Sequence, residues 1–230
     1  MTIDWLARWQ NGHIGWHRKE VNWRLKKYLP QLDLKPGDEV LLPLAGKSVD
    51  ILYLSQQGFK VIAIELSQIA VEAFFSENGL KPTIRVCGQF TLYQTSNIRF
   101  YLGDIFDITA QMVQNTAAIY DRAALIALDK PKRKAYIDML VRVVPKSTKW
   151  LLLILDYPQQ QKSPPPFAVS DEEVSMLFAH RHQIKILHCV DDLVNDKKFL
   201  AAGVDFLYKI TYLITLKQEI PSVAENAGNC

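Results

Sequence analysis

Glu39–Glu65, EVLLPLAGKSVDILYLSQQGFKVIAIE, is the stretch that decides the fold. Two short runs inside it, Val40–Leu44 and Val61–Ile64, are apolar at almost every position. Runs of this kind are typical of parallel strands whose two faces are both covered. The segment between them, Lys47–Gln57, is long enough for a helix of about three turns. The stretch therefore predicts a strand, a helix and a second strand parallel to the first.

Two glycines mark the ends of the predicted helix. Gly46 follows the first strand almost at once. Gly58 stands just after the last helical residue, where a left-handed cap favours glycine. Within the helix, Val49, Leu52 and Tyr53 share one face, and we expect this face to pack on the sheet.

Glu65 ends the second strand, 19 residues after Gly46. In a right-handed strand–helix–strand unit, the carboxyl ends of both strands open onto one crevice. An acidic residue about 20 residues after the turn glycine binds the ribose hydroxyls in dinucleotide sites. Glu65 could instead cap the next helix, but Ser67 is the better N-cap residue. The spacing therefore predicts that Glu65 binds the ribose of an adenosine-containing cofactor.

The number of glycines selects among such cofactors. Nicotinamide and flavin sites usually carry three, because a pyrophosphate has to approach backbone N–H groups at the start of a helix. This turn holds only Gly46, so a cofactor with adenosine and no pyrophosphate, such as S-adenosylmethionine, fits better. A Walker loop does not match, because that motif requires a glycine at the position of Leu41.

The alternation of strands and helices continues along the chain. Further predicted elements are a hairpin over Arg85–Thr95, strands over Ile98–Leu102, Ala117–Tyr120 and Lys149–Leu155, a helix over Pro131–Val144, and a late antiparallel pair over Ile184–Asp191 and Phe206–Leu216. Asp121 and Arg122 follow the fourth strand, on the side where the crevice opens. A plainer interpretation of these two residues is a local ion pair on the surface.

Composition favours one domain of catalytic size. The chain has 230 residues, 49% of them hydrophobic, and no linker rich in proline, glycine or serine divides it. We therefore expect a single domain over residues 1–216 and a disordered tail over 217–230. The formal charge is only +3 and the basic residues are scattered, which argues against nucleic-acid binding.

Neither a leader peptide nor a membrane anchor is evident. The N-terminus has no charged leader before an apolar core, and the longest apolar run, Trp150–Leu155, is too short to cross a bilayer. We expect a cytoplasmic monomer without membrane association. Cys87, Cys189 and Cys230 fit reduced thiols, with Cys189 expected in the core.

Metal binding is not expected. His13 and His17 have the spacing of ligands on one helical face. Gly15 lies between them and no third ligand is near, which argues against a zinc site.

Several short motifs occur in a fixed order along the chain. They are Trp9, IGWH at 14–17, PLAGKS at 43–48, AIELS at 63–67, FF at 74–75, DRAAL at 121–125, DY at 156–157 and PPF at 165–167. From about Trp5 to about Leu216, this ordered set resembles the thiopurine S-methyltransferase family in its bacterial branch. The resemblance implies the α/β fold of class I S-adenosylmethionine-dependent methyltransferases. That fold is a Rossmann-like, mostly parallel seven-stranded sheet with an antiparallel C-terminal hairpin and helices on both faces.

The resemblance also implies a reaction, the transfer of a methyl group from S-adenosylmethionine to the sulfur of an aromatic or heterocyclic thiol. Together with the turn glycine, it gives the cofactor-binding candidates Trp9, Leu44, Gly46, Glu65, Asp104, Ile105 and Arg122. Residues 1–30 would close over the site as a lid. Trp5 and Trp9, four residues apart, could instead form a helical stripe that faces the core.

The acceptor side of the expected site combines cations with flat apolar side chains. Arg122 and Lys198 are the catalytic candidates, because a cation stabilises the thiolate form of an acidic thiol. Trp16, where the family commonly has phenylalanine, and Phe167, from a proline-rich loop, are the candidates for substrate binding. Lys198 stands where an arginine is expected and lacks its planar, forked donation, so acceptor preference could differ. Ala45 replaces the usual cysteine of the turn, one small residue for another.

Three other functions stay open at this stage. One is methylation of selenium or tellurium species by the same fold. The others are a non-catalytic cofactor-binding protein and an NAD(P) reductase.

Overall fold

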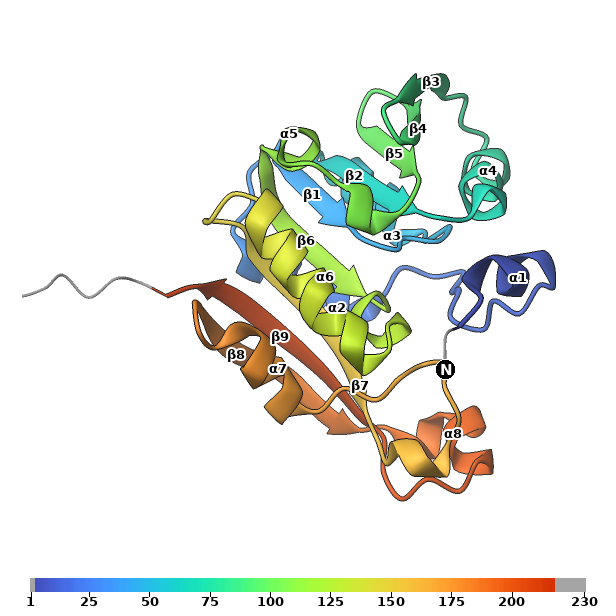
Figure 1. The fold of residues 1–230 in the computed structure, drawn as a ribbon, viewed down its shortest axis with the longest axis vertical. Coiled ribbons are helices and arrows are strands. Elements are labelled where there is room, and N and C mark those ends of the chain that lie inside the picture. The colour runs from blue at the N-terminus through green and yellow to red at the C-terminus, as the bar shows by residue number, and fades with distance from the viewer. Residues whose placement is uncertain (1–2, 218–230) are drawn as a thin grey trace, which may run out of the picture.

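The computed structural model describes residues 3–217 and arranges them around one sheet (Figure 1). Among these residues the sheet has nine strands in the spatial order β3-β4-β5-β2-β1-β6-β7-β9-β8. The strands are β1 (Glu39–Leu42), β2 (Lys60–Glu65), β3 (Thr83–Cys87), β4 (Phe90–Gln94), β5 (Ile98–Leu102), β6 (Thr116–Arg122), β7 (Lys149–Asp156), β8 (His182–Asp191) and β9 (Tyr208–Leu216). The five central strands, from β5 to β7, run parallel, and β9 and β8 follow as the predicted antiparallel pair.

The expected seven strands are present, and the predicted hairpin extends the same sheet to nine. Strand β4 pairs antiparallel with β5, and β3 pairs antiparallel with β4. This pairing covers the outer edge of β5, whose backbone groups would otherwise be exposed to intermolecular pairing. The sequence predicted the hairpin but not its place in the sheet.

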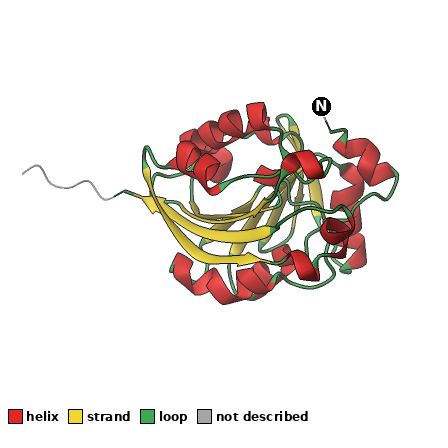
Figure 2. Ribbon diagram, turned by 90° about the horizontal axis from the view of Figure 1, so that it is seen from below, coloured by secondary structure: helices red, strands yellow, loops and turns green. Residues whose placement is uncertain are grey.

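Helices cover both faces of the sheet (Figure 2). They are α1 (Trp5–Gln10), α2 (Trp23–Tyr28), α3 (Asp50–Gln56), α4 (Gln68–Glu77), α5 (Ala110–Val113), α6 (Lys130–Val143), α7 (Asp171–Phe178) and α8 (Lys197–Ala201). Residues of α2, α3 and α4 pack on one face, and residues of α5, α6 and α7 pack on the other. Both faces of the central strands are therefore buried, as their apolar runs predicted.

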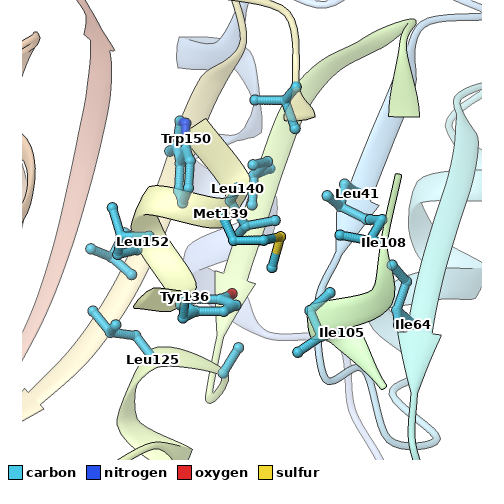
Figure 3. Packing of buried hydrophobic residues seen from close by; sticks show 14 of the residues in the cluster. Leu41, Ile64, Ile105, Ile108, Leu125, Tyr136, Met139, Leu140, Trp150 and Leu152 are labelled. Atoms are coloured by element: carbon cyan, nitrogen blue, oxygen red, sulfur yellow. The ribbon is translucent and has the colours of Figure 1, made fainter. Parts of the chain in front are cut away.

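The core beneath α6 contains the largest buried side chains of that face. Trp150 and Tyr136 are almost fully buried there, and Leu140 and Met139 of α6 fill the space above the sheet (Figure 3). Burying a side chain of this size contributes about 1.5–3 kcal/mol. This face therefore holds the carboxyl end of β6 firmly in place.

The helix after β1 differs from the prediction in its start and in its buried face. It begins at Asp50 rather than Lys47, and its buried apolar residues are Ile51 and Leu54. Of the expected stripe of Val49, Leu52 and Tyr53, all three side chains are half-buried, and Leu52 and Tyr53 pack at the edge of the core. Beside Ile51 and Leu54, Asp50 is 1% exposed and accepts hydrogen bonds from Asn22 N at 2.8 Å and Tyr120 Oη at 3.1 Å.

One cysteine was also misplaced by the sequence analysis. Cys189 is exposed on β8, the edge strand, rather than in the core, and Cys87 is half-buried. An edge strand presents alternate side chains to solvent even where its sequence is apolar. Cys230 and the predicted tail lie outside the described residues, apart from Lys217, whose N–H donates to Arg181 O at 3.0 Å.

No helix within residues 3–217 combines the length and the apolar character needed to cross a bilayer.

Candidate active site

A cleft of about 1320 Å³ runs along the carboxyl ends of the parallel strands. In Figure 1, α1 and α8 lie on the side toward which the arrows of β2, β5 and β6 point. Of the candidate residues, those that line the cleft are Trp9, Trp16, Leu44, Glu65, Asp104, Ile105, Arg122, Phe167 and Lys198. Gly46 does not line it and contributes through its neighbours. The topology thus brings together side chains from residue 9 to residue 198.

Glu65 is the best anchored group in the cleft. It is 8% exposed, Oε2 accepts a hydrogen bond from Gly46 N at 2.9 Å, and Oε1 accepts one from Ser67 N at 2.9 Å. Burial raises the pKa of Glu65, and the surrounding backbone N–H groups oppose that rise. Each carboxylate oxygen has a second lone pair, so the group can still accept hydrogen bonds from two hydroxyls.

The alternative role for Glu65, capping the following helix, belongs to another residue. Ser67 is the N-cap of α4, and its Oγ accepts a hydrogen bond from Ala70 N at 3.4 Å. Glu65 holds the turn before that helix instead, and its edge faces the cleft.

The ends of β1 and β6 have an unusual backbone. Leu44 has a φ of 47° and Ala123 a φ of 68°, which place two non-glycine residues in the left-handed region. Such conformations cost about 1–3 kcal/mol each and cluster at functional sites. At β1, the N–H of Ala45 donates to Ile64 O at 2.9 Å and holds the turn against β2. Both strained residues line the cleft.

The residues after β5 form the next part of the wall. Gly103 N donates to Glu65 O at 2.9 Å, which fixes the end of β5 beside the end of β2. Asp104 Oδ1 accepts a hydrogen bond from Phe106 N at 3.0 Å and starts a short turn, and Ile105 is buried. The result is an apolar slot bordered by a carboxylate.

Three tryptophans of the N-terminal segment close over the turn after β1. The ring centroid of Trp16 is 5.2 Å from that of Trp5 and 5.7 Å from that of Trp9, both edge to face. Trp9 is 7% exposed, and a Cβ added to Gly46 would lie 3.2 Å from its ring. Gly46 also has a φ of 55°, so both space and backbone require glycine.

The tryptophans are not a stripe on the hydrophobic core. Among the described residues, none of the three clusters of buried side chains contains Trp5 or Trp9. Both residues line the cleft instead.

Arg122 links β6 to the N-terminal segment. Its Nη2 donates to the backbone oxygen of Trp16 at 3.1 Å, and the side chain lines the cleft. The alternative prediction, a surface ion pair between Asp121 and Arg122, is wrong, because Asp121 is fully buried on the opposite face of the strand. There Asp121 accepts hydrogen bonds from Leu125 N at 3.1 Å and Tyr136 Oη at 2.8 Å, and burial raises its pKa to about 6.

Phe167 and Lys198 come from two loops on the far side of the cleft. Phe167 N donates to Ile126 O at 2.8 Å, which ties the proline-rich loop to the turn after β6. Lys198 lies on α8 with an exposed side chain, and its Nζ would be 2.7 Å from a Cβ at Gly15. The loop of α8 therefore contacts the N-terminal segment across the cleft.

Several lining residues were missed by the sequence analysis, among them Arg8, Lys162 and Phe199. Arg8 precedes Trp9 and Phe199 follows Lys198, so adjacency to a candidate was a signal for these two, and Lys162 had none. Within residues 3–217 there is no group of three His, Cys, Asp or Glu residues that could hold a metal ion.

Comparison with known proteins agrees with this geometry. The family model described as thiopurine S-methyltransferase matches residues 2–217. The chain is 40% identical over 210 residues to the thiopurine S-methyltransferase of Nitrosospira multiformis, covering 91% of this chain and 96% of the relative. The relative of that name from Pseudomonas aeruginosa is 41% identical over 210 residues, with the same coverage. The chain belongs to the thiopurine S-methyltransferase family.

More distant solved structures share the fold. A methyltransferase from Anabaena variabilis, described as S-adenosylmethionine-dependent, has a TM-score of 0.60 at 16% identity and covers 93% of each chain. The 1,6-didemethyltoxoflavin-N1-methyltransferase of Burkholderia thailandensis, solved with S-adenosylhomocysteine, has a TM-score of 0.62 at 13% identity, covering 93% of this chain and 86% of that one. The predicted class I fold, methyltransferase activity and S-adenosylmethionine dependence are confirmed.

Proposed function

We propose that this protein transfers the methyl group of S-adenosylmethionine to the sulfur of aromatic and heterocyclic thiols. The observation that carries the proposal is that one cleft holds both a candidate cofactor site and a candidate acceptor site. At one end, the buried carboxylate of Glu65 still has free lone pairs for hydrogen bonds. At the other end is the cation Arg122, which donates to the backbone oxygen of Trp16.

The residues around Glu65 fit an adenosine group. Glu65 has unused lone pairs for the two ribose hydroxyls, and Ile105 and Leu44 offer apolar surface to the adenine ring. Asp104 borders the same slot. Trp9 covers the turn at Gly46, so it would exclude water from one side of the bound cofactor.

When bound, S-adenosylmethionine supplies an electrophilic methyl group and a thioether leaving group. The protein has to hold the acceptor sulfur in line with that methyl group and keep the sulfur anionic. Arg122 stabilises the thiolate by its opposite charge, which lowers the pKa of the acceptor thiol. Lys198 is a second cation on the far wall. Because the thiol loses its proton before the transfer, the chain needs no dedicated general base.

Trp16 and Phe167 form the apolar walls for the acceptor ring in this proposal. Trp16 belongs to the segment that closes over the site, and Arg122 donates to its backbone oxygen. Closure of residues 1–30 would therefore bring the acceptor ring and the thiolate-stabilising cation into place together.

The test is transfer of a labelled methyl group from S-adenosylmethionine to 6-mercaptopurine and to thiophenol, with selenite as a third acceptor. The Arg122→Ala variant should lower kcat/KM for the thiols by about 100-fold, the usual effect of removing one group that stabilises developing or fixed charge. The matched control is Arg99→Ala, an arginine paired with Glu39 at the other end of the sheet.

The three acceptors distinguish the remaining hypotheses. If selenite is methylated and neither thiol is, the acceptor of this enzyme is a selenium or tellurium species and not a thiol. Tight binding of S-adenosylmethionine with no methylated product from any acceptor would indicate a non-catalytic protein. Equal activity of the Arg122→Ala and Arg99→Ala variants would remove Arg122 from the mechanism.

A further inference from the structure

The cations that line the cleft besides Arg122 include three on the acceptor side, Arg8, Lys162 and Lys198. Arg8 comes from α1, Lys162 from the loop after β7 and Lys198 from α8. Among residues 3–217, none of the ion pairs includes any of these four side chains. One cation is enough to stabilise one thiolate, so the other three point to a second negative charge.

Lys162 is held in place by its own loop. Gln159 Nε2 donates to Lys162 O at 2.8 Å, and Gln159 Oε1 accepts from Ala168 N at 2.8 Å. Tyr157 Oη donates to Pro166 O at 2.6 Å. These bonds fix the backbone of the loop on both sides of Lys162; its side chain lines the cleft, and its Nζ donates to Ser163 O at 3.4 Å.

The ammonium of Lys162 also has a defined neighbour. Its Nζ lies 4.9 Å from the centroid of Phe199, and the Phe199 ring packs edge to face on Tyr157 with centroids 4.9 Å apart. Phe199 is adjacent to Lys198 in α8. Lys162 therefore contacts the Phe199 ring, and Lys198 is the residue before it in the chain.

Arg8 approaches from the opposite wall. Its guanidinium carbon is 5.7 Å from the centroid of the Trp16 ring, and its Nε is buried with no hydrogen-bond partner among residues 3–217. A buried donor without a partner costs about 1–3 kcal/mol. An anion that entered this end of the cleft would relieve that cost.

The cations also repel one another. Burial lowers the pKa of Lys162; of the neighbouring charges, Asp196 has the largest influence and raises the pKa, while Lys198 and Arg8 lower it. Asp196 is already paired with Lys209 at 3.2 Å. Even with Asp196 counted, Arg8, Lys162 and Lys198 leave a net positive charge at this part of the cleft.

Resting on the proposed S-methylation, we infer that Arg8, Lys162 and Lys198 form an anion-binding subsite that holds a carboxylate on the ring of the thiol acceptor. The acceptor would be an aromatic or heterocyclic thiol with two negative charges. Its sulfur would face Arg122 and its carboxylate would face the subsite. Trp16 and Phe199 line the same cleft and offer aromatic surface to the acceptor ring.

The experiment compares 4-mercaptobenzoate with 4-mercaptobenzamide, a neutral acceptor of nearly the same shape. The ratio of their kcat/KM values should favour the carboxylate by about tenfold or more in the wild type, since a hydrogen bond to a charged group contributes about that factor. Lys162→Gln and Arg8→Gln should each lower the ratio several-fold, and the double variant should bring it close to one. Lys60→Gln, which removes one charge at an exposed position at the start of β2, is the matched control and should keep the ratio.

Equilibrium binding of the same two compounds to the enzyme loaded with S-adenosylhomocysteine gives a readout without turnover. If thiophenol is not methylated, the proposed function fails, but a carboxylate preference in binding that depends on Lys162 would still support the subsite. Equal affinity for acid and amide in the wild type would overturn it. It would also be overturned if Lys162→Gln weakened binding of S-adenosylhomocysteine itself, because the cluster would then serve the cofactor's own carboxylate.

Discussion

The two ends of the cleft are built in different ways. At the cofactor end, Glu65 joins adjacent strand ends, because its carboxylate accepts a hydrogen bond from Gly46 N and its backbone oxygen accepts one from Gly103 N. At the acceptor end, the side chains come from three separate segments, namely α1, the loop after β7 and α8, with contacts such as Lys198 against Gly15. A site built from neighbouring strand ends is fixed by the core beneath it. A site assembled from separate loops depends on a few side-chain contacts.

This difference separates affinity for the cofactor from choice of acceptor. Strand ends cannot move without disturbing the sheet, so the cofactor end should tolerate few substitutions. The loops at the acceptor end can change side chains without such a cost. The arginine that the family resemblance led us to expect is a lysine here, Lys198, and it lies on the short helix α8 at this end of the cleft.

The largest effect is expected from Glu65→Gln. The glutamine has one acceptor oxygen in place of two, and its NH₂ would face a backbone N–H of Gly46 or Ser67. Two hydrogen bonds to a charged group contribute about 1.5 kcal/mol or more each, so the Kd for S-adenosylmethionine should rise at least about 100-fold. Isothermal titration calorimetry measures this change.

The control for that variant is Glu39→Gln. Glu39 is also 8% exposed and forms an ion pair with Arg99 at 2.8 Å, but it lies at the amino end of β1. The Glu39→Gln variant should lower the free energy of unfolding and leave the Kd for S-adenosylmethionine unchanged. If Glu39→Gln and Glu65→Gln raised this Kd by the same factor, the weaker binding would come from a general loss of stability and not from a lost ribose contact.

The same comparison explains what the sequence could predict. Glu65 was found by its spacing from Gly46, because a strand–helix–strand unit fixes the relative position of its two strand ends. That spacing is realised as a direct hydrogen bond between the two residues at 2.9 Å. Hydrophobic runs likewise predicted the central strands, since both of their faces are buried.

Other features depend on contacts that no local pattern records. Asp50 is buried in α3 by hydrogen bonds from Asn22 and Tyr120. These partners lie 28 and 70 residues away in the sequence, so no local pattern could predict that an aspartate is buried there. Arg8 and Lys162 meet at the acceptor end only because the chain folds its N-terminus over the loop after β7. Periodicity along the sequence carries no information on such pairs.

The next effect concerns the core beneath the end of β6, through Asp121. Its pKa of about 6 in the folded protein lies above the usual 3.8, so the folded state binds the proton more tightly. The free energy of unfolding should therefore fall as pH rises from about 4 to about 6. Relative to Asp121→Asn, which does not titrate, the wild type should lose up to about 3 kcal/mol over this window. Urea unfolding at several pH values measures the difference between the two proteins.

If the difference in free energy of unfolding between the wild type and Asp121→Asn stayed constant from about pH 4 to about pH 6, Asp121 would not titrate with a raised pKa. The matched variant is Tyr136→Phe, which removes the hydroxyl that donates to Asp121 at 2.8 Å. Loss of that bond disfavours the ionised carboxylate further, so this variant should show a steeper fall in stability as pH rises. Together, the two variants measure how strongly the end of β6 depends on the core.

The smallest effect is expected at the acceptor end, from Trp16→Ala. Trp16 is half-buried, lies outside the core clusters, and packs against Trp5 and Trp9. Because the segment can open locally without unfolding of the sheet, the Tm should change by no more than about 2 °C. The value of kcat/KM for thiophenol should fall by about tenfold, since one wall of the acceptor site is lost. Tyr208→Ala, at an aromatic residue that is 38% exposed, packs on Phe206 and is not part of the cleft lining, should leave kcat/KM unchanged. If Trp16→Ala instead lowered the Tm strongly and weakened S-adenosylmethionine binding as much as Glu65→Gln, the two ends of the cleft would be one cooperative unit, and acceptor choice could not change independently of the cofactor site.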